Sequence, residues 1–329
     1  MISIVIPVHN EVESLESLYA EIDDVARTQG YDLEIIFVDD GSTDNSWRSI
    51  QQLAATDSRV HGIRLRRNFG KACALSAGFD AAAGEIVFTM DGDLQDDPRE
   101  IPRFLEHLGD RYDVVSGWKQ VRHDPWHKVL PSRVFNWAVS FLTGVQLHDH
   151  NCGFKCYRRE IFDEIRLYGE LHRFVPVLAS SRGYRVGEIT VGHRQRKFGH
   201  SKYGVGRLPK GFLDLMTVKF LTGFGQRPQH ALGTLGLGFF SLGIFGIVVL
   251  TGFWFLTRPP FDWFDEPVHL TDRAIFFYSI IALFLGCQLL SLGFLAELMA
   301  SYVAHDRQPY SIAEQTDKSK PPISDSRSS

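Results

Sequence analysis

Cysteine is scarce in this chain, with four residues among 329. Cys152 and Cys156 have no second pair and no histidines at zinc-site spacing, and Cys73 and Cys287 stand apart. This pattern argues against a disulfide-stapled secreted domain and against a structural zinc site. Free thiols in a reducing compartment are therefore the expected state.

An excess of charge of one sign is also missing. The 35 Lys and Arg residues against 39 Asp and Glu residues give a formal net charge of −4. A chain that binds nucleic acid through its overall charge is strongly basic, so no nucleic-acid partner is expected. The chain shows no secretory signal peptide, because it begins with the apolar run 2–8, and its N-terminal part is expected to stay in the cytoplasm.

Charge is absent from two long segments near the C-terminus. Residues 230–256 lie between Arg227 and Arg258 with no charged residue between them, and residues 274–296 form a second uncharged run. Each is long enough to cross a hydrocarbon core of about 30 Å as a helix. Neither has a polar face, which disfavours the alternative of two buried soluble helices.

We therefore expect a multi-pass membrane protein with a transmembrane hairpin over 228–304, its helices at about 230–256 and 274–300. Basic residues flank the hairpin and acidic residues dominate its loop, which predicts that both termini lie on the cytoplasmic side of the inner membrane. Segment 204–227 has an amphipathic basic pattern and is predicted to lie in the bilayer interface, the alternative being a helix packed on the sheet. The polar tail 305–329 is expected to be disordered. Glycines in the two spans permit close helix packing, and with it a homo-oligomer.

Residues 1–203 have the pattern of an α/β domain. Short β-branched runs alternate with helical patterns. The expected strands are 2–8, 33–38, 60–65, 85–90 and 113–116. This alternation predicts a parallel sheet with helices on both faces. Ligands bind such sheets beyond the carboxyl ends of the strands, where several polar clusters of this sequence fall.

One of these clusters follows the strand at 85–90. Asp91 and Asp93 are two residues apart, so in extended backbone they project to the same side. With the Gln95 amide oxygen they form a set of hard oxygen ligands suited to Mg²⁺ or Mn²⁺. The alternative is a polar loop that ends a buried strand.

Six motifs in order resemble those of the polyprenyl-phosphate glycosyltransferases, which are GT-A enzymes of family 2 that include dolichol-phosphate mannose synthases and bactoprenol glucosyltransferases. The motifs are Ile6-Pro-Val-His-Asn-Glu11, Val38-Asp-Asp-Gly-Ser-Thr-Asp44, Arg67-Asn-Phe-Gly-Lys71, Met90-Asp-Gly-Asp-Leu-Gln95, Asp149-His-Asn-Cys-Gly-Phe154 and His193-Arg-Gln-Arg-Lys-Phe-Gly-His-Ser-Lys-Tyr203. The resemblance covers residues 1 to about 210 and implies a Rossmann-like, mostly parallel GT-A sheet. The two C-terminal spans fit the bacterial glucosyl branch.

The resemblance also implies roles for individual residues. Asp93 and Gln95 match the direct metal ligands, and Asp91 matches a residue that contacts the nucleotide or coordinates through water. The positions that match nucleotide-sugar contacts are Pro7, His9, Glu11, Asp39, Asp40, Asp91, Gly92, Asp93, Lys119, Arg196 and Lys202. His9 stands where the family usually has Tyr, which leaves the base-stacking contact open. Lys119 replaces the commoner Arg, so bidentate contact is lost there and Arg122 is the alternative.

The expected acceptor is a lipid phosphate, which needs cationic anchoring near the membrane. The residues assigned to it are Arg122, Ser132, Arg133, Arg194 and Ser201. Because this acceptor is already an anion, a general base is not strictly required. Asp149 is the remaining catalytic candidate beside Asp91 and Asp93; it orients the acceptor, acts as a base, or caps the turn before residues 152–154. For Arg67, Asn68 and Lys71, packing and helix capping are favoured over contact with the diphosphate.

The expected function is inverting transfer of a hexose, glucose from UDP-glucose, to undecaprenyl phosphate at the cytoplasmic membrane face. One alternative keeps the fold and changes the donor to GDP-mannose or a UDP-amino sugar. A polysaccharide synthase is disfavoured because no QxxRW-type motif and no further spans are present. A non-catalytic membrane scaffold is a third possibility, which the presence of all three metal-ligand residues disfavours.

Overall fold

The computed structural model describes residues 1–109, 111–120, 126–165, 171–194, 213–219, 222, 228–258, 270 and 274–304. The chain divides into two compact units. The first reaches to Thr222, and the second contains the two long C-terminal helices. Arg122, Arg196, Ser201 and Lys202, all predicted site residues, lie outside the described residues.

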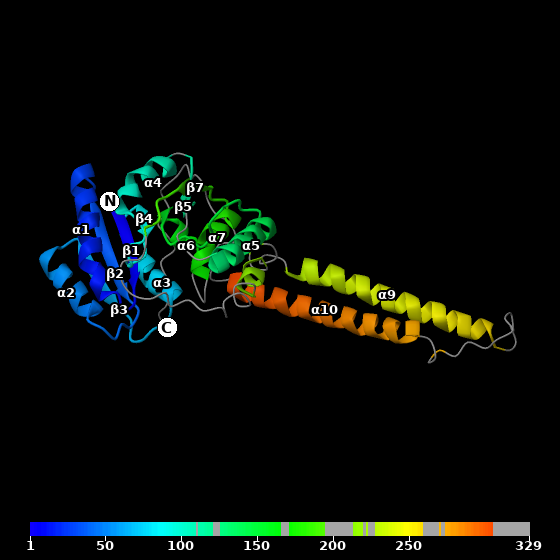
Figure 1. Cartoon of the computed structure of the whole chain (residues 1–329). Coiled ribbons are helices and arrows are strands. Elements are labelled where there is room, and N and C mark those ends of the chain that lie inside the picture. The colour runs from blue at the N-terminus through cyan, green and yellow to red at the C-terminus, as the bar shows by residue number, and fades with distance from the viewer. Residues whose placement is uncertain are drawn as a thin grey trace, which may run out of the picture. The chain divides into compact units, whose positions relative to one another are not determined.

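The first unit is built on a 7-stranded sheet with the order β3-β2-β1-β4-β6-β5-β7 (Figure 1). The strands are β1 (Ile2–Val8), β2 (Leu33–Asp39), β3 (Val60–Arg64), β4 (Ile86–Thr89), β5 (Val114–Trp118), β6 (Lys155–Arg158) and β7 (Val186–Thr190). Neighbouring strands pair in parallel, except that β6 runs antiparallel to both β4 and β5. The predicted mostly parallel GT-A-type sheet is confirmed. It contains two strands that the sequence analysis did not predict, β6 between β4 and β5, and β7 at the edge.

Helices cover both faces of this sheet, as the alternation of strand and helix patterns predicted. They are α1 (Val12–Gln29), α2 (Ser46–Thr56), α3 (Lys71–Ala81), α4 (Ile101–Leu108), α5 (Trp126–Thr143), α6 (Ile161–Glu164) and α7 (Val175–Ser181), with the 3-10 turns η1 (Pro98–Glu100) and η2 (Leu171–Phe174). Successive residues of a strand point to opposite faces, so each strand contributes to two cores.

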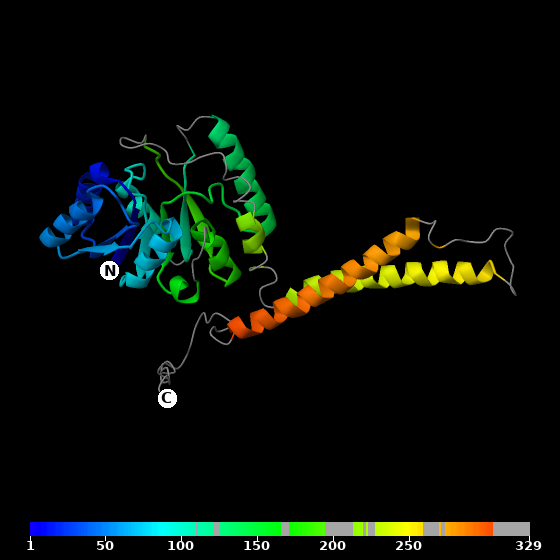
Figure 2. The ribbon, with the colours of Figure 1, turned by 90° about the horizontal axis from the view of Figure 1, so that it is seen from below.

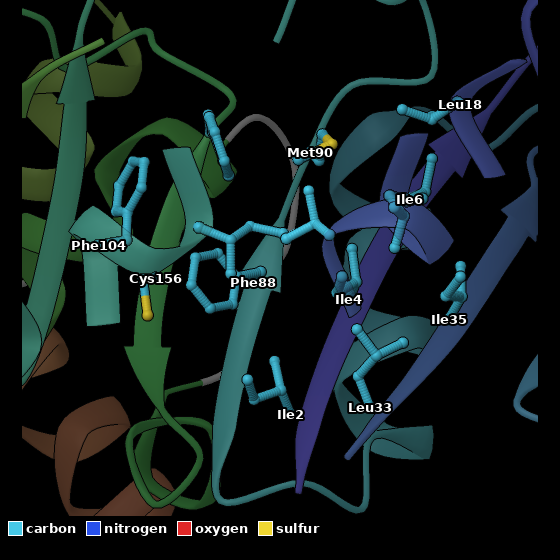
Figure 3. Close-up of a cluster of buried hydrophobic side chains, with 14 of the residues drawn as sticks. Ile2, Ile4, Ile6, Leu18, Leu33, Ile35, Phe88, Met90, Phe104 and Cys156 are labelled. Atoms are coloured by element: carbon cyan, nitrogen blue, oxygen red, sulfur yellow. The ribbon is translucent and has the colours of Figure 1, made fainter. Parts of the chain in front are cut away.

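Figure 3 shows the core on one face, where Ile2, Ile4 and Ile6 of β1 pack with Ile35 of β2 and Phe88 of β4. Leu18 of α1 and Phe104 of α4 close this core. On the other face, the intervening residue Val5 packs in a second cluster with residues of α3. A Cβ on Gly78 of α3 would lie 2.2 Å from Val5 Cγ1, so that helix approaches the sheet as closely as a glycine allows. With both faces covered, the edge at the carboxyl ends of the strands is left for a site.

The second unit consists of α9 (Pro228–Leu256) and α10 (Ala274–Ala304), which lie side by side in antiparallel order (Figure 2). Glycines bring the two backbones together, since a Cβ on Gly243 would lie 2.5 Å from Leu283 N and one on Gly286 would lie 2.4 Å from Phe240 N. Within these helices, Gln229–Leu256 and Ala274–Met299 are long and apolar enough to cross a membrane, and only 6% and 11% of their most apolar windows are buried. Their apolar surface is therefore exposed, unlike that of core helices in a soluble domain.

Part of the segment predicted to lie in the bilayer interface is described, as a helix over 213–219. Leu215 and Val218 are buried in a cluster with Val139 of α5 and Phe174 of η2. Leu213, on another side of the helix, has an exposed fraction of 64%. This helix packs against α5 and η2 of the same unit through one face and exposes another, as both alternatives require. Its location in the bilayer interface stays a prediction.

Candidate active site

Polar loops from three neighbouring strands meet at the carboxyl edge of the sheet. The Asp40 N–H donates to the Val8 carbonyl at 2.8 Å, which joins the loops after β1 and β2. His9 Nδ1 lies 3.0 Å from the Asp40 carbonyl oxygen, and His9 Nε2 lies 3.2 Å from the Asn68 side-chain nitrogen. The residues that the sequence separated are thus brought together, as the strand order predicted.

The two contacts of His9 determine its tautomer. The Asn68 amide nitrogen can only donate, so His9 Nε2 accepts. Nδ1 then carries the hydrogen and donates it to the Asp40 carbonyl oxygen. Bonds at both nitrogens fix the orientation of its ring.

Asp39 and Asp40, both predicted to bind the nucleoside, hold the loops around His9. Asp39 Oδ1 accepts from the Ser42 N–H at 2.9 Å, and its Oδ2 lies 3.2 Å from Arg64 Nε. The two Asp40 oxygens accept from the N–H groups of Phe69 and Gly70, at 2.7 and 2.9 Å. Both carboxylates are buried and support the loop, while Asp39 Oδ2 accepts no hydrogen bond from the described residues. Their contact with the nucleoside stays a prediction.

Pro7 and Glu11, two further predicted contacts, flank His9. Pro7 is half-buried near the end of β1, and Glu11 is half-buried at the start of α1. The Glu11 N–H donates to Ser46 Oγ at 3.0 Å. Asn10, between them, has φ 54°, and its side-chain oxygen accepts from the Thr43 N–H at 2.8 Å. A positive φ is uncommon outside glycine, and Asn is among the residues that adopt it most readily.

The residues from Asp91 to Asp96 form a tight turn after β4. The Asp91 N–H donates to Asp96 Oδ2 at 3.2 Å, and Asp93 Oδ1 accepts from the Gln95 N–H at 3.1 Å. Leu94 has φ 61°, a strained conformation for a bulky residue that costs on the order of 1–3 kcal/mol. Its side chain is 3% exposed and packs in the main core, which offsets that cost. The Gly92 carbonyl oxygen accepts from Ser14 Oγ at 2.5 Å, which ties the turn to α1.

Two lysines lie against this turn. Lys71, the first residue of α3, forms an ion pair with Asp91, whose side chain is 31% exposed. Lys119 Nζ lies 2.8 Å from Asp96 Oδ1; the Asp96 side chain is fully buried and that of Lys119 is 13% exposed. Burial would raise the pKa of Asp91, but the positive charges of Lys71 and Lys119 outweigh it and lower that pKa to about 2. Burial would lower the pKa of Lys119, but Asp96 outweighs it and raises that pKa.

These contacts add to two interpretations of the sequence. Lys119, assigned to the donor phosphate, is paired with Asp96 inside the turn, and its phosphate contact stays a prediction. Lys71, assigned mainly to packing and capping, reaches the Asp91 carboxylate. The sequence did not reveal these pairs, because the partner of a charged side chain depends on the folded neighbourhood rather than on the local motif.

The predicted metal ligands fit a divalent cation by their chemistry. Asp93 and Gln95 supply hard oxygens within one turn, and Asp91 adds a carboxylate that is already paired with Lys71. No group of three His, Cys, Asp or Glu side chains gathers at metal-binding spacing within the described part of the chain, so the set consists of two carboxylates and an amide. Gly153 keeps the space beside Asp91 open, since a Cβ there would lie 2.6 Å from Asp91 Oδ2.

Arg194, predicted to bind the lipid phosphate, has other partners. Its guanidinium lies 2.6 Å from Glu21 Oε2 and 2.6 Å from Asp97 Oδ2. Burial would lower the pKa of Arg194, but these two carboxylates outweigh it and raise that pKa. The arginine therefore anchors the chain after β7 to α1 and to the residue before η1. Ser132 and Arg133, the other predicted lipid-phosphate residues that are described, lie on α5, half-buried and exposed respectively.

Asp149 is 1% exposed, and its Oδ1 accepts from the Asn151 N–H at 3.1 Å. Among the roles considered for it, the structure shows the turn cap. Glu188 of β7 supports the same loop by accepting from the Asp149 N–H at 3.0 Å. Lys155 of β6 lies beneath the loop and donates to the carbonyl oxygen of Cys152 at 2.6 Å. Burial lowers the pKa of Lys155 to about 8.

Four supporting residues were missed by reasoning from the sequence: Asp96, Lys155, Glu188 and His193. Asp96 sits one residue after Gln95, so the run of acids after the strand could have drawn attention to it. Lys155 follows directly after the motif that ends at Phe154. A lysine at such a position is normally expected to be exposed, so its burial was not predicted. Glu188 carries no signal, and His193 opens the motif 193–203 without any indication of its partner, because the contacts of both residues join segments far apart in the sequence.

Comparison with known proteins agrees with this architecture. Residues 3–166 match the family described as glycosyl transferase family 2. A dodecaprenyl-phosphate galacturonate synthase from Rhizobium johnstonii is 35% identical over 323 residues, which cover 95% of this chain and 92% of that protein. An undecaprenyl-phosphate 4-deoxy-4-formamido-L-arabinose transferase from Aeromonas hydrophila is 36% identical over 301 residues, which cover 90% of this chain and 87% of that protein.

Among solved structures, glucosyl-3-phosphoglycerate synthase from Mycobacterium tuberculosis has the same fold, with a TM-score of 0.52 and 20% identity. The match covers 68% of this chain and 78% of that one. At this identity the likeness concerns the fold of the first unit. The two full-length relatives go further, because they match the catalytic domain and the C-terminal helices together. The chain belongs to glycosyl transferase family 2, among its polyprenyl-phosphate glycosyltransferases.

Proposed function

We propose that this chain transfers a sugar, with inversion, from a nucleotide sugar to polyprenyl phosphate at the cytoplasmic face of a membrane, with a divalent cation as cofactor. The observation that carries the proposal is the turn from Asp91 to Gln95. It gathers two carboxylates and an amide beside Lys71, at the sheet edge where the His9 loop also lies. Such a set suits the diphosphate of a nucleotide sugar, which binds through a cation and a neighbouring ammonium group.

Asp93 and Gln95 would hold the cation, with Asp91 beside it. When bound, Mg²⁺ or Mn²⁺ neutralises the charge that develops on the leaving diphosphate. A divalent cation is also supported by the structural neighbour from Mycobacterium tuberculosis, which was crystallised with Mn²⁺ and UDP-glucose. Lys71 supplies a second positive charge at the same turn.

The loops around His9 would receive the nucleoside. The ring of His9 is fixed by bonds at both nitrogens, which preorganises it as a surface for stacking the base. Asp39 and Asp40 act on this site through the loops that they hold. The assignments of Pro7, Glu11 and Gly92 to the donor stand as part of this proposal.

The acceptor side would need no general base, because a lipid phosphate is already ionised at neutral pH. Asp149 is buried and caps its turn, so we assign it to shaping the loop beside Asp91. Ser132 and Arg133 of α5 are the described candidates for anchoring the lipid phosphate. Arg122 and Ser201 complete this set from outside the described residues, where Arg196 and Lys202, assigned to the nucleotide sugar, also lie.

The sugar is the least determined part of the proposal. Glucose was predicted from the resemblance to the bacterial glucosyl branch, whereas the names of the curated relatives specify galacturonate and 4-deoxy-4-formamido-L-arabinose. We therefore propose all three as candidate sugars. GDP-mannose serves as the test of a different nucleotide.

The experiment is a donor panel with the purified full chain in detergent. UDP-glucose, UDP-galacturonate, UDP-4-deoxy-4-formamido-L-arabinose and GDP-mannose are each incubated with undecaprenyl phosphate, with Mg²⁺, with Mn²⁺ or with EDTA. Formation of lipid-linked sugar from one donor, lost in EDTA, is the expected result. No product from any donor and either cation would contradict the proposed reaction, and product that persists in EDTA would contradict the metal role alone.

We further propose that α9 and α10 both span the membrane with the two chain termini in the cytoplasm. The exposed apolar surface of both helices supports this, together with the acidic loop between their basic flanks. Reporter fusions in the loop near residue 265 and at the C-terminus should report opposite sides. The same side for both would contradict the hairpin.

A further inference from the structure

The side chain of Gln95 is held by the chain segment that follows β7. Gln95 Nε2 lies 3.2 Å from His193 Nε2 and 3.5 Å from the Arg194 carbonyl oxygen. The backbones are joined as well, because the Arg194 N–H donates to the Gln95 carbonyl oxygen at 3.1 Å. A residue of the candidate metal turn is thus bonded to a segment about a hundred positions further along the chain.

These contacts decide which end of the Gln95 amide faces which way. A backbone carbonyl can only accept a hydrogen bond, so the atom of Gln95 that faces Arg194 must be the amide nitrogen. His193 Nε2 then acts as the acceptor for the other hydrogen of the same NH₂ group. The amide oxygen is left on the opposite side of the group.

This orientation matters because only the oxygen of an amide is a ligand for Mg²⁺ or Mn²⁺. An amide turned over would present its NH₂ hydrogens to the cation and repel it. Oxygen and nitrogen differ little in size, so packing alone distinguishes the two orientations poorly. The acceptors at His193 and Arg194 supply the distinction.

We propose that His193 is a positioning residue that orients the Gln95 amide so that its oxygen faces the divalent cation. This inference rests on the proposed metal role of Gln95. Groups that orient a ligand in this way commonly affect metal affinity by about 10–100-fold when they are removed.

Arg194 keeps the orienting segment in place. Its guanidinium bonds Glu21 of α1 and Asp97, which lies two residues beyond Gln95. The carbonyl that faces Gln95 and the side chain that reaches Asp97 therefore belong to the same residue. If the segment at residues 193–194 moved away from the Asp91 turn, the contacts of Arg194 with Gln95, Glu21 and Asp97 would all be lost.

The test measures binding of Mn²⁺ alone to the purified full chain, by electron paramagnetic resonance of the free ion. His193→Phe keeps a ring without an acceptor and is expected to weaken Mn²⁺ binding about tenfold. His193→Asn restores an acceptor oxygen and is expected to bind Mn²⁺ more tightly than His193→Phe. Thermal unfolding of each variant checks that the fold is intact.

Gln95→Glu provides the discriminating background, because a carboxylate has an oxygen at both ends. In Gln95→Glu, adding His193→Phe is expected to change the Mn²⁺ affinity by less than about twofold, so the two effects are non-additive. An equal loss in both backgrounds would overturn the inference and make His193 a direct ligand or a folding residue. Unchanged affinity in His193→Phe would overturn it as well. Absence of Mn²⁺ binding in the unaltered chain would instead contradict the metal role in the proposed function.

Discussion

Asp96 and Lys119 form a buried ion pair of 2.8 Å beneath the turn that carries Asp91 and Asp93. The other oxygen of Asp96 accepts from the Asp91 N–H, so one carboxylate joins the turn after β4 to the residue that follows β5. Lys119 also lowers the pKa of Asp91, although the charge of Lys71 contributes more. The pair therefore supports the turn that carries Asp91, and its lysine helps to lower the pKa of Asp91.

Asp96→Asn should destabilise the protein by about 3–5 kcal/mol, because it leaves the Lys119 ammonium buried without its counter-charge. Thermal unfolding of the full chain in detergent measures the effect. The double variant Asp96→Asn with Lys119→Met removes both charges and should be less destabilised than the single variant. A double variant that is as unstable as the sum of both single variants would show that the pair carries no coupling.

Asp93→Asn should lower sugar transfer by about a hundredfold or more, because one of the two proposed direct cation ligands loses its charge. Initial rates with the active donor at several Mn²⁺ concentrations measure this. Asp163→Asn on α6 is a matched control, since Asp163 is exposed and far along the chain from the turn. Full activity of Asp93→Asn in cells, with folding unaltered, would favour the scaffold alternative.

Gly153→Ala should reduce transfer with little loss of stability. The added Cβ would lie 2.6 Å from Asp91 Oδ2, so the flexible carboxylate must turn away while the backbone remains in place. Gly192→Ala is the control, because a Cβ at Gly192 would have no neighbour closer than 3.8 Å. Rates and melting temperatures of both variants give the comparison. Equal rates would show that the position of the Asp91 carboxylate is unimportant.

Lys155 should make stability depend on pH above neutrality. Its pKa is about 8 in the folded protein against 10.5 for an ordinary lysine, so between these values the unfolded state binds more protons. The contribution of Lys155 to the free energy of unfolding therefore rises with pH between about 8 and 10.5. The unfolding free energy of the natural chain relative to Lys155→Met should increase by about 2 kcal/mol between pH 7.5 and 10. A difference that is constant with pH would contradict this account.

The framework of the fold could be predicted from the sequence because its signals are local. The strands β1, β2 and β4 are recognisable from their β-branched runs. The two C-terminal helices are recognisable from their lack of charge. β6 was not predicted, since four residues with a lysine and an arginine look like a surface loop. They form a strand because β4 and β5 pair with them on both sides.

The candidate site was predictable in its location and less so in its contacts. The positions of Asp91, Asp93 and Gln95 follow from the end of one strand. The partners of Lys119 and Arg194 depend on which loops fold beside them, and both residues bind carboxylates of the protein where phosphates were predicted. His193 meets Gln95 only because β7 ends at the same edge of the sheet, which no spacing in the sequence indicates.

The reversed direction of β6 has a consequence for how this protein can be varied. The chain leaves β5 and enters β6 at the same edge of the sheet, as the pairing of Ser116 with Lys155 requires. Residues 119–154, with α5 among them, are thus an insertion whose two ends are joined by neighbouring strands. The part of this segment around α5 can vary without changing the order of the strands, whereas its two ends carry Lys119 and Gly153, which support the Asp91 turn. It offers a route by which acceptor preference could diverge, or be engineered, while the donor half of the enzyme stays constant.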